Sequence, residues 1–393
     1  MSVLDQLSAE EVGERLRIAR EKANLTQEDA AKVIDVARTT LTAIEKGQRR
    51  ARFPEVQKLS EAYGTSVNAL LRREAIHVDL APRFRKLFNS NDKAETEAAE
   101  LIDNLAKAEV ELETLLGVRR ARNYPPERPI LPGDVRAQAE SDAMELRHAL
   151  GLGIRPVPDI VTLLELELGV RVFIRKVDTR ISGLFVYDEV LGPCVLLNAN
   201  HPRERRTQTA GHETGHFISS RRNPEIFHRY ETENSREERY ANTFGRAFLT
   251  PARGVMQKFH EVTAGSDRLR RRHIIILAHF FGVSREAMVR RLEELGLTKQ
   301  GTWRWFESHG GITDEQAIEV LGDLSVPDRE RAEAQQPTTL RLNLLAAEAY
   351  RQNLLSEGQL ARLLGLDRIE LREVIGALEA EGGGTDGVAK PLD

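Results

Sequence analysis

The chain contains a single cysteine, Cys194, among 393 residues. One thiol excludes both an internal disulfide and a structural zinc site built from several cysteines. Aromatic residues make up only 5% of the chain, and 57 Lys and Arg nearly balance 61 Asp and Glu, for a formal net charge of -4. This balance points to no class of partner by itself, so a nucleic-acid surface would have to come from local clusters of cations.

Long apolar runs are missing as well. No window approaches the roughly 18 consecutive apolar residues that a membrane span needs. The start Met1-Ser2-Val3-Leu4-Asp5 lacks the basic and hydrophobic segments of a signal peptide. We therefore expect a cytoplasmic protein with no membrane partner. A length of 393 residues is too great for one ordinary core and predicts two or three domains.

The most specific motif that is present is His212-Glu213-Thr214-Gly215-His216. Residues four apart lie on the same face of a helix, so both imidazoles can reach a single Zn²⁺ ion. Glu213 is then placed to take a proton from an attacking water. The motif predicts the core of a metal-dependent hydrolase. The alternative is a helix with two surface histidines and a solvated glutamate, which five residues also permit by chance.

A catalytic zinc normally takes three protein ligands and leaves a fourth position open. The segment from Ser235 to Pro251 is typical of a helix that could supply the third ligand. Its apolar residues recur at helical spacing, and Pro251 ends it. Glu238 lies one turn before Ala241 on the apolar stripe, so we expect it to point inward, where a carboxylate needs a partner such as a metal. Glu237 is the rival, and only the phase of the helix favours Glu238.

The run from His212 to Pro251, with H-E-x-G-H followed by E-x-x-A-N-x-F and Leu-x-Pro, resembles the ImmA/IrrE family of metallopeptidases. The resemblance extends upstream to residues 181–183 and 195–198 and downstream to residues 277–287. It implies that His212, His216 and Glu238 bind Zn²⁺ and that Glu213 is the catalytic base. Some members of this family cut a phage-type or stress-type repressor, which implies a repressor-type protein as substrate.

A second pattern lies at the N-terminus. Apolar spacing predicts a helix through Val12 and Leu16, a second helix capped by Thr26, and a third from Arg38 to Gly47, with Asp35 in the tight turn between the last two. Two short helices joined in this way, the second rich in Arg and Thr, are the arrangement that inserts a recognition helix into the major groove. Four cations follow, where DNA phosphates would lie, namely Lys46, Arg49, Arg50 and Arg52.

The pattern from Leu25-Thr26-Gln27 to Ile44-Glu45-Lys46-Gly47 resembles the XRE (phage-repressor-like) helix-turn-helix family over about residues 10–73, including a fourth helix around Pro54–Tyr63 and a fifth around Val67–Leu71. It implies binding to double-stranded DNA, and by a homodimer, because dimers of this class read two half-sites. The expected DNA-facing residues are Gln27, Arg38, Thr39, Thr40, Thr42, Lys46 and Arg49. The alternative is a helical dimerisation module that has lost DNA binding.

The rest of the chain divides by composition. Residues 74–133 read as a connector, with a helix over Lys93–Val118 that is either a packed connector or a paired helix in a dimer, and with a proline-rich breaker over Asn123–Gly133. Residues 134–262 are expected to form the metallopeptidase core and residues 263–380 a helical region with two helix-turn-helix-like units. Residues 381–393, rich in glycine, are expected to be disordered.

Within the metallopeptidase core, alternation and length predict the secondary structure. The expected helices are Val135–Leu150 and Pro158–Leu168, and the expected strands are Val170–Ile174, Leu184–Tyr187 and Cys194–Asn198. The edge of such a small sheet could hold an extended peptide substrate. Candidates for the side chain that stabilises the oxyanion are His228, Tyr230 and Tyr240, any of which could equally be structural.

Together these patterns predict a mainly α protein with a small β-sheet: an N-terminal all-α domain of five helices, an α+β zincin-like metallopeptidase domain, and a helical C-terminal region. The expected function is a DNA-binding transcriptional regulator with a zinc-dependent endopeptidase domain, which cleaves a repressor-type protein in response to stress or to a phage or mobile-element signal. The alternatives are a transcription factor whose zinc domain is a non-proteolytic sensor, and an antitoxin or phage-defence component whose first domain binds a partner. Glu213 favours turnover, because a structural zinc site needs no base.

Overall fold

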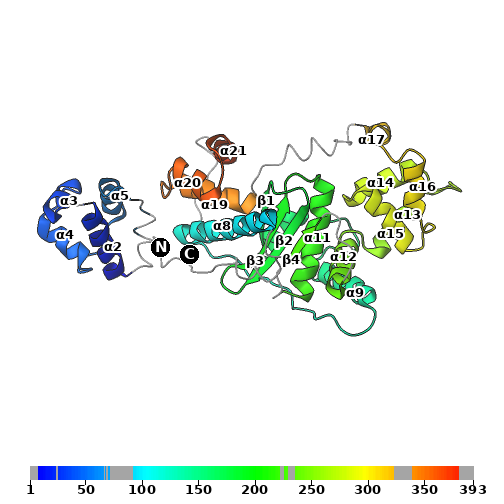
Figure 1. Cartoon of the computed structure of the whole chain (residues 1–393), viewed down its shortest axis with the longest axis horizontal. Coiled ribbons are helices and arrows are strands. Elements are labelled where there is room, and N and C mark those ends of the chain that lie inside the picture. Colours follow the sequence, from blue (N-terminus) through cyan, green and yellow to red (C-terminus); the bar gives the residue numbers. More distant parts are fainter. Residues whose placement is uncertain are drawn as a thin grey trace. The chain divides into compact units, whose positions relative to one another are not determined.

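The computed structural model describes residues 8–23, 25–65, 67, 70, 92–221, 225–228, 235–322 and 339–379. The chain divides into two units, one formed by residues 1–78, 107–120 and 342–393 and the other by residues 79–106 and 121–341. Helices dominate both units, and the one sheet in the described part of the chain lies in the second (Figure 1). The predicted fold class is confirmed. The tail predicted to be disordered, residues 381–393, lies outside the described residues.

The N-terminal region is built from four described helices, namely α2 (Ala9–Lys22), α3 (Gln27–Val33), α4 (Arg38–Glu45) and α5 (Phe53–Ala62). Thr26 caps α3 by accepting a hydrogen bond from the backbone N–H of Asp29, as predicted. Leu16, Leu41 and Leu59 are fully buried in a core shared by these helices. The predicted fifth helix lies mostly outside the described residues.

The turn between α3 and α4 depends on Asp35, whose φ is 55°. A side chain makes this left-handed conformation costly, although aspartate is among the residues that tolerate it best. The turn therefore forms where the sequence predicted it, with aspartate in a position that glycine would fill without strain.

The long helix predicted after this region is present as α8 (Lys93–Leu116). Three further helices follow much later in the chain, namely α19 (Leu340–Arg351), α20 (Glu357–Leu364) and α21 (Arg368–Glu379). No described helix is both long and apolar enough to cross a membrane.

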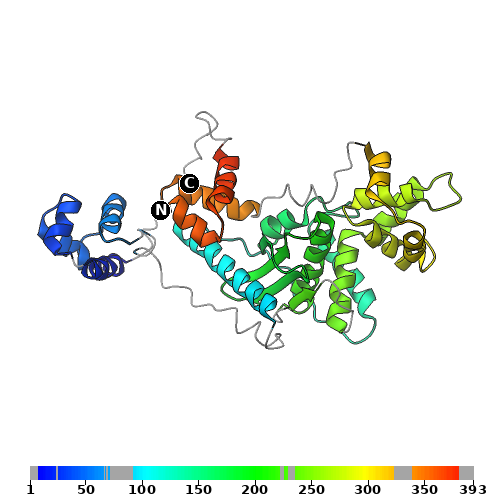
Figure 2. The same ribbon diagram turned by 45° about the horizontal axis from the view of Figure 1, so that its top comes forward.

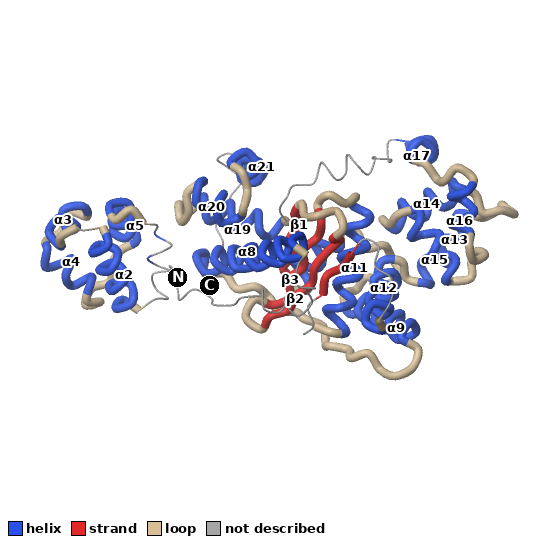
Figure 3. Tube along the Cα trace, in the orientation of Figure 1, coloured by secondary structure: helices blue, strands red, loops and turns tan. Residues whose placement is uncertain are grey.

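The sheet of the second unit has four strands in the order β1-β3-β2-β4 (Figure 3). They are β1 (Arg171–Arg175), β2 (Ile181–Asp188), β3 (Gly192–Asn198) and β4 (Glu225–His228). β1 runs parallel to β3, whereas β2 is antiparallel to both β3 and β4. Every residue of β1 and β3 is buried, so both faces of the sheet are covered. Three of these strands were predicted and β4 was not.

Three helices flank the motif region, namely α9 (Val135–Ala149), α11 (Arg203–Ser219) and α12 (Arg236–Leu249). α12 packs between α9 and α11, and α11 also contacts β2 (Figures 1 and 2). The proline-rich segment before α9 forms no helix or strand, as predicted. Two hydrogen bonds hold it against this unit. The backbone N–H of Arg128 donates to the Ile218 carbonyl at 2.7 Å, and the Arg236 side chain donates to the Leu131 carbonyl at 2.7 Å.

The prediction of one regular α-helix over Pro158–Leu168 is wrong. The structure has a short α10 (Ile160–Thr162) that continues as a π-helix, η1 (Leu163–Glu167). The Leu168 N–H donates to the Leu163 carbonyl five residues back. Leu163 and Leu168 are both buried, and the wider turn brings residues five apart closer to one line along the helix than a regular α-helical turn does.

Beyond Pro251 the second unit is helical, with α13 (Ala252–Val262), α14 (Arg271–Phe281), α15 (Arg285–Glu294), α16 (Thr302–Ser308) and α17 (Asp314–Leu321). The core is continuous with that of the sheet, because Phe281 and Leu292 belong to the same buried cluster as Phe185 and Phe248. α15 is tied to the earlier helices by Arg291, which is buried and pairs with Glu140.

Candidate functional site

The H-E-x-x-H motif lies within α11, where a regular helical turn sets His212 above His216. The two rings meet edge to face with centroids 4.7 Å apart, and their Nε2 atoms are 3.0 Å apart. Both side chains are buried. Two close imidazole nitrogens that face each other inside the protein need a shared cation or proton between them.

Glu238 joins the two histidines from the first turn of α12. Ser235 caps this helix by accepting a hydrogen bond from the Glu238 N–H, which fixes the start of the helix. Oε2 of Glu238 lies 3.5 Å from Nε2 of His212, and Oε1 lies 3.3 Å from Nε2 of His216. These three residues form the one group of potential metal ligands found in the described part of the chain, and Glu237 is not a member of it.

The separations test whether the group fits a metal. Four ligands at the usual Zn–N and Zn–O distances of about 2.0–2.1 Å, placed at tetrahedral angles, lie roughly 3.3 Å from one another. The three observed separations, 3.0, 3.3 and 3.5 Å, bracket this value. Burial, together with the neighbouring His216, lowers the pKa of His212 well below its ordinary value. A lowered pKa favours the neutral imidazole, which is the form that binds metals.

The other nitrogen of each imidazole is also held. Nδ1 of His212 lies 3.1 Å from Oδ1 of Asn242, and Nδ1 of His216 lies 3.4 Å from Oγ of Ser220. Such contacts orient a ligating imidazole, and a proton donated from Nδ1 leaves Nε2 available to bind a metal. Asn242 appeared before only as the N of the E-x-x-A-N-x-F pattern, and neither it nor Ser220 was predicted to have a role. Each stands four residues after a predicted ligand, Glu238 and His216 respectively, and that spacing is the signal that could have found them.

Glu213 is fully buried and lies against β2. A Cβ added to Gly183 would come within 2.9 Å of Oε1 of Glu213 and 2.5 Å of Cγ2 of Thr209. The absence of a side chain at Gly183 therefore leaves the room in which the Glu213 carboxylate sits. Gly183 lies within the extent of the family resemblance, but no role was predicted for it.

α11 and α12 approach closely behind the histidines. A Cβ at Gly215 would lie 2.6 Å from the Cα of Ala241, and one at Gly245 would lie 2.8 Å from the backbone nitrogen of His212. Real Cβ atoms do not come this close, so both positions require glycine for the present spacing. The small residues let the two backbones meet and bring Glu238 within reach of both imidazoles.

Of the three candidates for oxyanion stabilisation, only Tyr240 has a described side chain. Tyr240 is fully buried, and its hydroxyl donates to Oδ2 of Asp142 at 2.8 Å, so it holds α12 to α9. Burial raises the pKa of Tyr240, and the hydrogen bond to Asp142 raises it further. Tyr230 lies outside the described residues. His228 ends β4, and its side chain is likewise outside what the structure describes.

In the N-terminal region a buried ion pair joins α2 to α4. Nε of Arg20 lies 2.6 Å from Oε1 of Glu45, and both side chains are buried. The same carboxylate accepts a hydrogen bond from the amide of Gln27 at 2.9 Å, and the amide oxygen of Gln27 accepts one from Thr42 at 3.3 Å. The network therefore positions two of the predicted DNA-facing residues, Gln27 and Thr42, on adjacent helices.

The remaining predicted DNA-facing residues differ in exposure. Arg38 and Thr39 at the start of α4 are exposed and Thr40 is half-buried, while Lys46 is exposed just beyond the end of α4. Arg49 is half-buried and forms a bidentate ion pair with Glu55, with N···O distances of 2.8 and 3.1 Å. The predicted set is thus gathered around α4, but the charge of Arg49 is already matched within the protein.

The helix-turn-helix-like unit formed by α14 and α15 presents a different surface. Gly282 makes its turn with φ 66°. The arginines of α15 are engaged within the protein, with Arg285 paired to Asp314, Arg290 to Glu286 and Arg291 to Glu140. These ion pairs make α15 a poor phosphate-binding helix and support a scaffolding role.

Comparison with known families identifies two regions of the chain. Residues 166–293 match the peptidase-family model described as the IrrE N-terminal-like domain. Residues 16–70 match the model described as helix-turn-helix. The chain therefore joins an XRE-type helix-turn-helix domain to an IrrE-like domain, which is the combination that its motifs predicted.

Curated proteins and solved structures give no further support for a function. No curated protein matched the chain. Among solved structures, the apo form of the competence regulator ComR from Streptococcus vestibularis aligns over 96% of this chain and 99% of its own, at 10% identity and a TM-score of 0.16. A similarity of that size carries no argument about fold or function.

Proposed function

We propose that this protein is a DNA-binding transcriptional regulator whose second unit is a zinc-dependent endopeptidase. The single observation that carries the enzymatic half is the group of His212, His216 and Glu238, whose ligand atoms lie at separations suited to one tetrahedral ion. The buried Glu213 follows His212 directly on the same helix. A purely structural zinc site has no use for a buried glutamate next to its ligands.

His212, His216 and Glu238 would hold the metal. When bound, Zn²⁺ lowers the pKa of a water molecule and polarises a carbonyl group. Glu213 would accept the proton of the attacking water as the new C–O bond forms, and would then deliver that proton to the amine of the departing peptide as the C–N bond breaks. Asn242 and Ser220 would keep both imidazoles oriented for this task.

The DNA-binding half rests on the helix-turn-helix match and on the exposed start of α4. Arg38, Thr39 and Thr40 would read base edges in the major groove, with Gln27 and Thr42 beside them. Lys46 would contact a phosphate, whereas Arg49 is held by its ion pair with Glu55. A homodimer would read two half-sites, and a symmetric footprint would be its signature.

A repressor-type protein is the proposed substrate, because the chain carries a repressor-like domain of its own next to the peptidase unit. The target could be a second copy of this chain or a separate repressor, cleaved in response to stress or to a phage or mobile-element signal. The full-length protein should therefore be incubated with and without added repressor proteins, and the fragments identified by mass spectrometry.

The test of the enzymatic half pairs Glu213→Gln with Glu237→Gln. The amide at position 213 keeps the shape of the side chain but cannot accept a proton at neutral pH, so cleavage should vanish while about one zinc per chain is retained. Glu237→Gln, one residue before the proposed ligand Glu238, should leave both unchanged. Cleavage that persists in Glu213→Gln would exclude Glu213 as the base.

The main rival is a transcription factor whose zinc unit senses the metal without proteolysis. It differs in a measurable way: DNA binding by the wild-type protein would change on removal of zinc, and no peptide bond would be cut under any condition. An antitoxin or phage-defence role for the first domain would instead show binding to a protein partner and no enriched DNA motif.

A further inference from the structure

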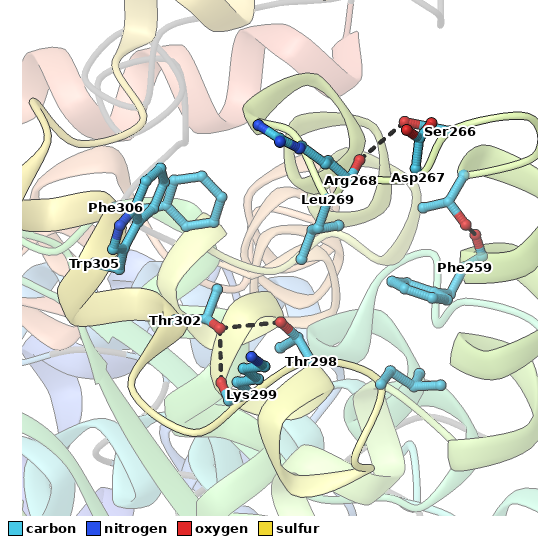
Figure 4. Close-up of a pocket in the computed structure, with 12 residues that line it drawn as sticks. Phe259, Ser266, Asp267, Arg268, Leu269, Thr298, Lys299, Thr302, Trp305 and Phe306 are labelled. Atoms are coloured by element: carbon cyan, nitrogen blue, oxygen red, sulfur yellow. Dashed lines mark hydrogen bonds between the residues drawn. The ribbon is translucent and has the colours of Figure 1, made fainter.

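A cavity of about 470 Å³ lies in the helical part of the second unit (Figure 4), and none of the residues that line it belongs to the metal group. The end of α13, the turn before α14, the turn between α15 and α16, and α16 itself surround it. Pockets that bind small molecules measure about 300–1,000 Å³. The cavity is therefore large enough for a small organic molecule and too small for a folded partner.

One part of the lining is apolar and aromatic. Figure 4 shows Trp305 and Phe306 on one side of the cavity and Phe259 on the other. Phe306 is buried, whereas Trp305 is 52% exposed although its ring stacks on His309 with centroids 4.3 Å apart. A half-exposed indole beside a cavity offers an apolar surface on which a planar ring can pack.

The other part of the lining is polar and carries a positive charge. The hydroxyls of Thr298 and Thr302 lie 3.0 Å apart in the wall. Two cations, Arg268 and Lys299, border the cavity with one carboxylate, Asp267, which leaves a net charge of +1. Both cations are exposed, and within the described residues no ion pair engages either of them. A site of this kind favours an anion.

We propose that this cavity binds a small molecule in which a planar aromatic ring carries an anionic group, as in a mononucleotide or an aromatic carboxylic acid. The ring packs between Trp305 and Phe259, and the anionic group is bound by Lys299 and Arg268. The proposal is independent of the peptidase and DNA-binding proposals, because it uses none of their residues.

The chain provides its own reporter for a test. It has two tryptophans, Trp303 and Trp305, and both belong to α16. The tryptophan fluorescence of the full-length protein therefore reports on this region alone. We would titrate the protein with adenosine 5′-monophosphate and with benzoate, and in parallel with adenosine and with inorganic phosphate, which each carry one half of the proposed chemistry.

The expected result is a saturable change in fluorescence with the nucleotide, with benzoate, or with both, at a Kd below about 1 mM. Adenosine and phosphate should bind at least about tenfold more weakly, since each lacks either the charge or the ring. Saturation by only one of the two probes would identify the source of the ligand. The absence of saturation with both probes, or equal binding of adenosine and its monophosphate, would overturn the proposal.

Variants locate the binding on the chain. Lys299→Gln and Arg268→Gln should each weaken binding by roughly tenfold, measured by titration calorimetry so that the result does not depend on tryptophan. Arg304→Gln is the matched control, because Arg304 is an exposed cation of α16 that does not line the cavity. All three side chains are exposed, so the fold should survive, as circular dichroism can verify. An equal loss in Arg304→Gln would mean diffuse binding to a basic surface and would refute the assigned site.

Discussion

Nδ1 of His212 lies 3.1 Å from the amide oxygen of Asn242, which stands one helical turn beyond Glu238 on α12. The same helix therefore supplies both the proposed carboxylate ligand and the group that orients one of the histidines. A shift of α12 relative to α11 would disturb the two together. The metal group is best understood as a property of the contact between these helices.

The first prediction concerns Asn242. Asn242→Leu should weaken zinc binding by about 10- to 100-fold, because the His212 ring loses the acceptor that holds it. Asn242→Asp keeps an acceptor oxygen at the same place and should retain most of the affinity. Competition with a chelator of known affinity measures both. Equal affinities for the Leu variant and the wild type would show that Asn242 has no part in holding the metal.

Gly245 tests the helix contact directly. Gly245→Ala would place a Cβ 2.8 Å from the backbone nitrogen of His212, so the helices must separate. Overpacking of this kind typically costs about 1–3 kcal/mol, and here it should also lower the zinc content of the protein. Gly376→Ala, in α21, meets no atom within 4 Å and serves as the control. Thermal unfolding and metal analysis of the two variants should diverge.

Much of this site could be predicted from local sequence. Helical periodicity places His212 and His216 on one face, and the phase of the apolar stripe selects Glu238 over Glu237. Gly245 and Gly183 could not be interpreted in the same way, because the atoms that exclude a side chain there come from segments distant in the chain. The strand β4 was missed for a related reason: its four residues become a strand only by pairing with β2.

The π-helix is another feature that local patterns do not specify. Apolar residues at Leu163, Leu164 and Leu168 fit an amphipathic α-helix about as well as the observed wide turn. The choice depends on packing against the rest of the core, in which all three are buried. Arg49 shows the same limit on the DNA-facing side, since its partner Glu55 is recognisable only in three dimensions.

Gly183 provides a prediction about chemistry rather than metal binding. Gly183→Ala would push a methyl group against Thr209 and the Glu213 carboxylate, so the base should move while His212, His216 and Glu238 remain in place. We expect zinc content near that of the wild type and cleavage reduced by at least about tenfold, since small displacements of catalytic groups are costly. Simultaneous loss of zinc would indicate a general disruption of the sheet instead.

The Arg20–Glu45 pair makes a prediction about the N-terminal helices. Glu45→Gln leaves Arg20 without its buried counter-charge, which typically costs about 3–5 kcal/mol, and it also disturbs the hydrogen bond to Gln27. Glu14→Gln breaks the exposed pair with Arg17, which solvent screens, and should leave the stability of the region almost unchanged. Hydrogen exchange of α2 to α5 in the full-length protein reports these helices separately. Equal protection in both variants would show that the buried pair does not stabilise the region.

The last prediction separates the two cations that sequence reasoning treated alike. Lys46 is exposed beyond α4, whereas the charge of Arg49 is matched by Glu55. A cation that neutralises one DNA phosphate contributes about 0.9 to the slope of log affinity against log salt concentration. Lys46→Gln should therefore reduce that slope by about this amount. Arg49→Gln should change it by less than half as much, and its main effect should be a looser link to α5. Affinity for duplex DNA measured over a range of salt concentrations gives both slopes. If Arg49→Gln lowered the slope as much as Lys46→Gln, Arg49 would have to leave Glu55 on binding, and the original expectation that it contacts phosphate would stand.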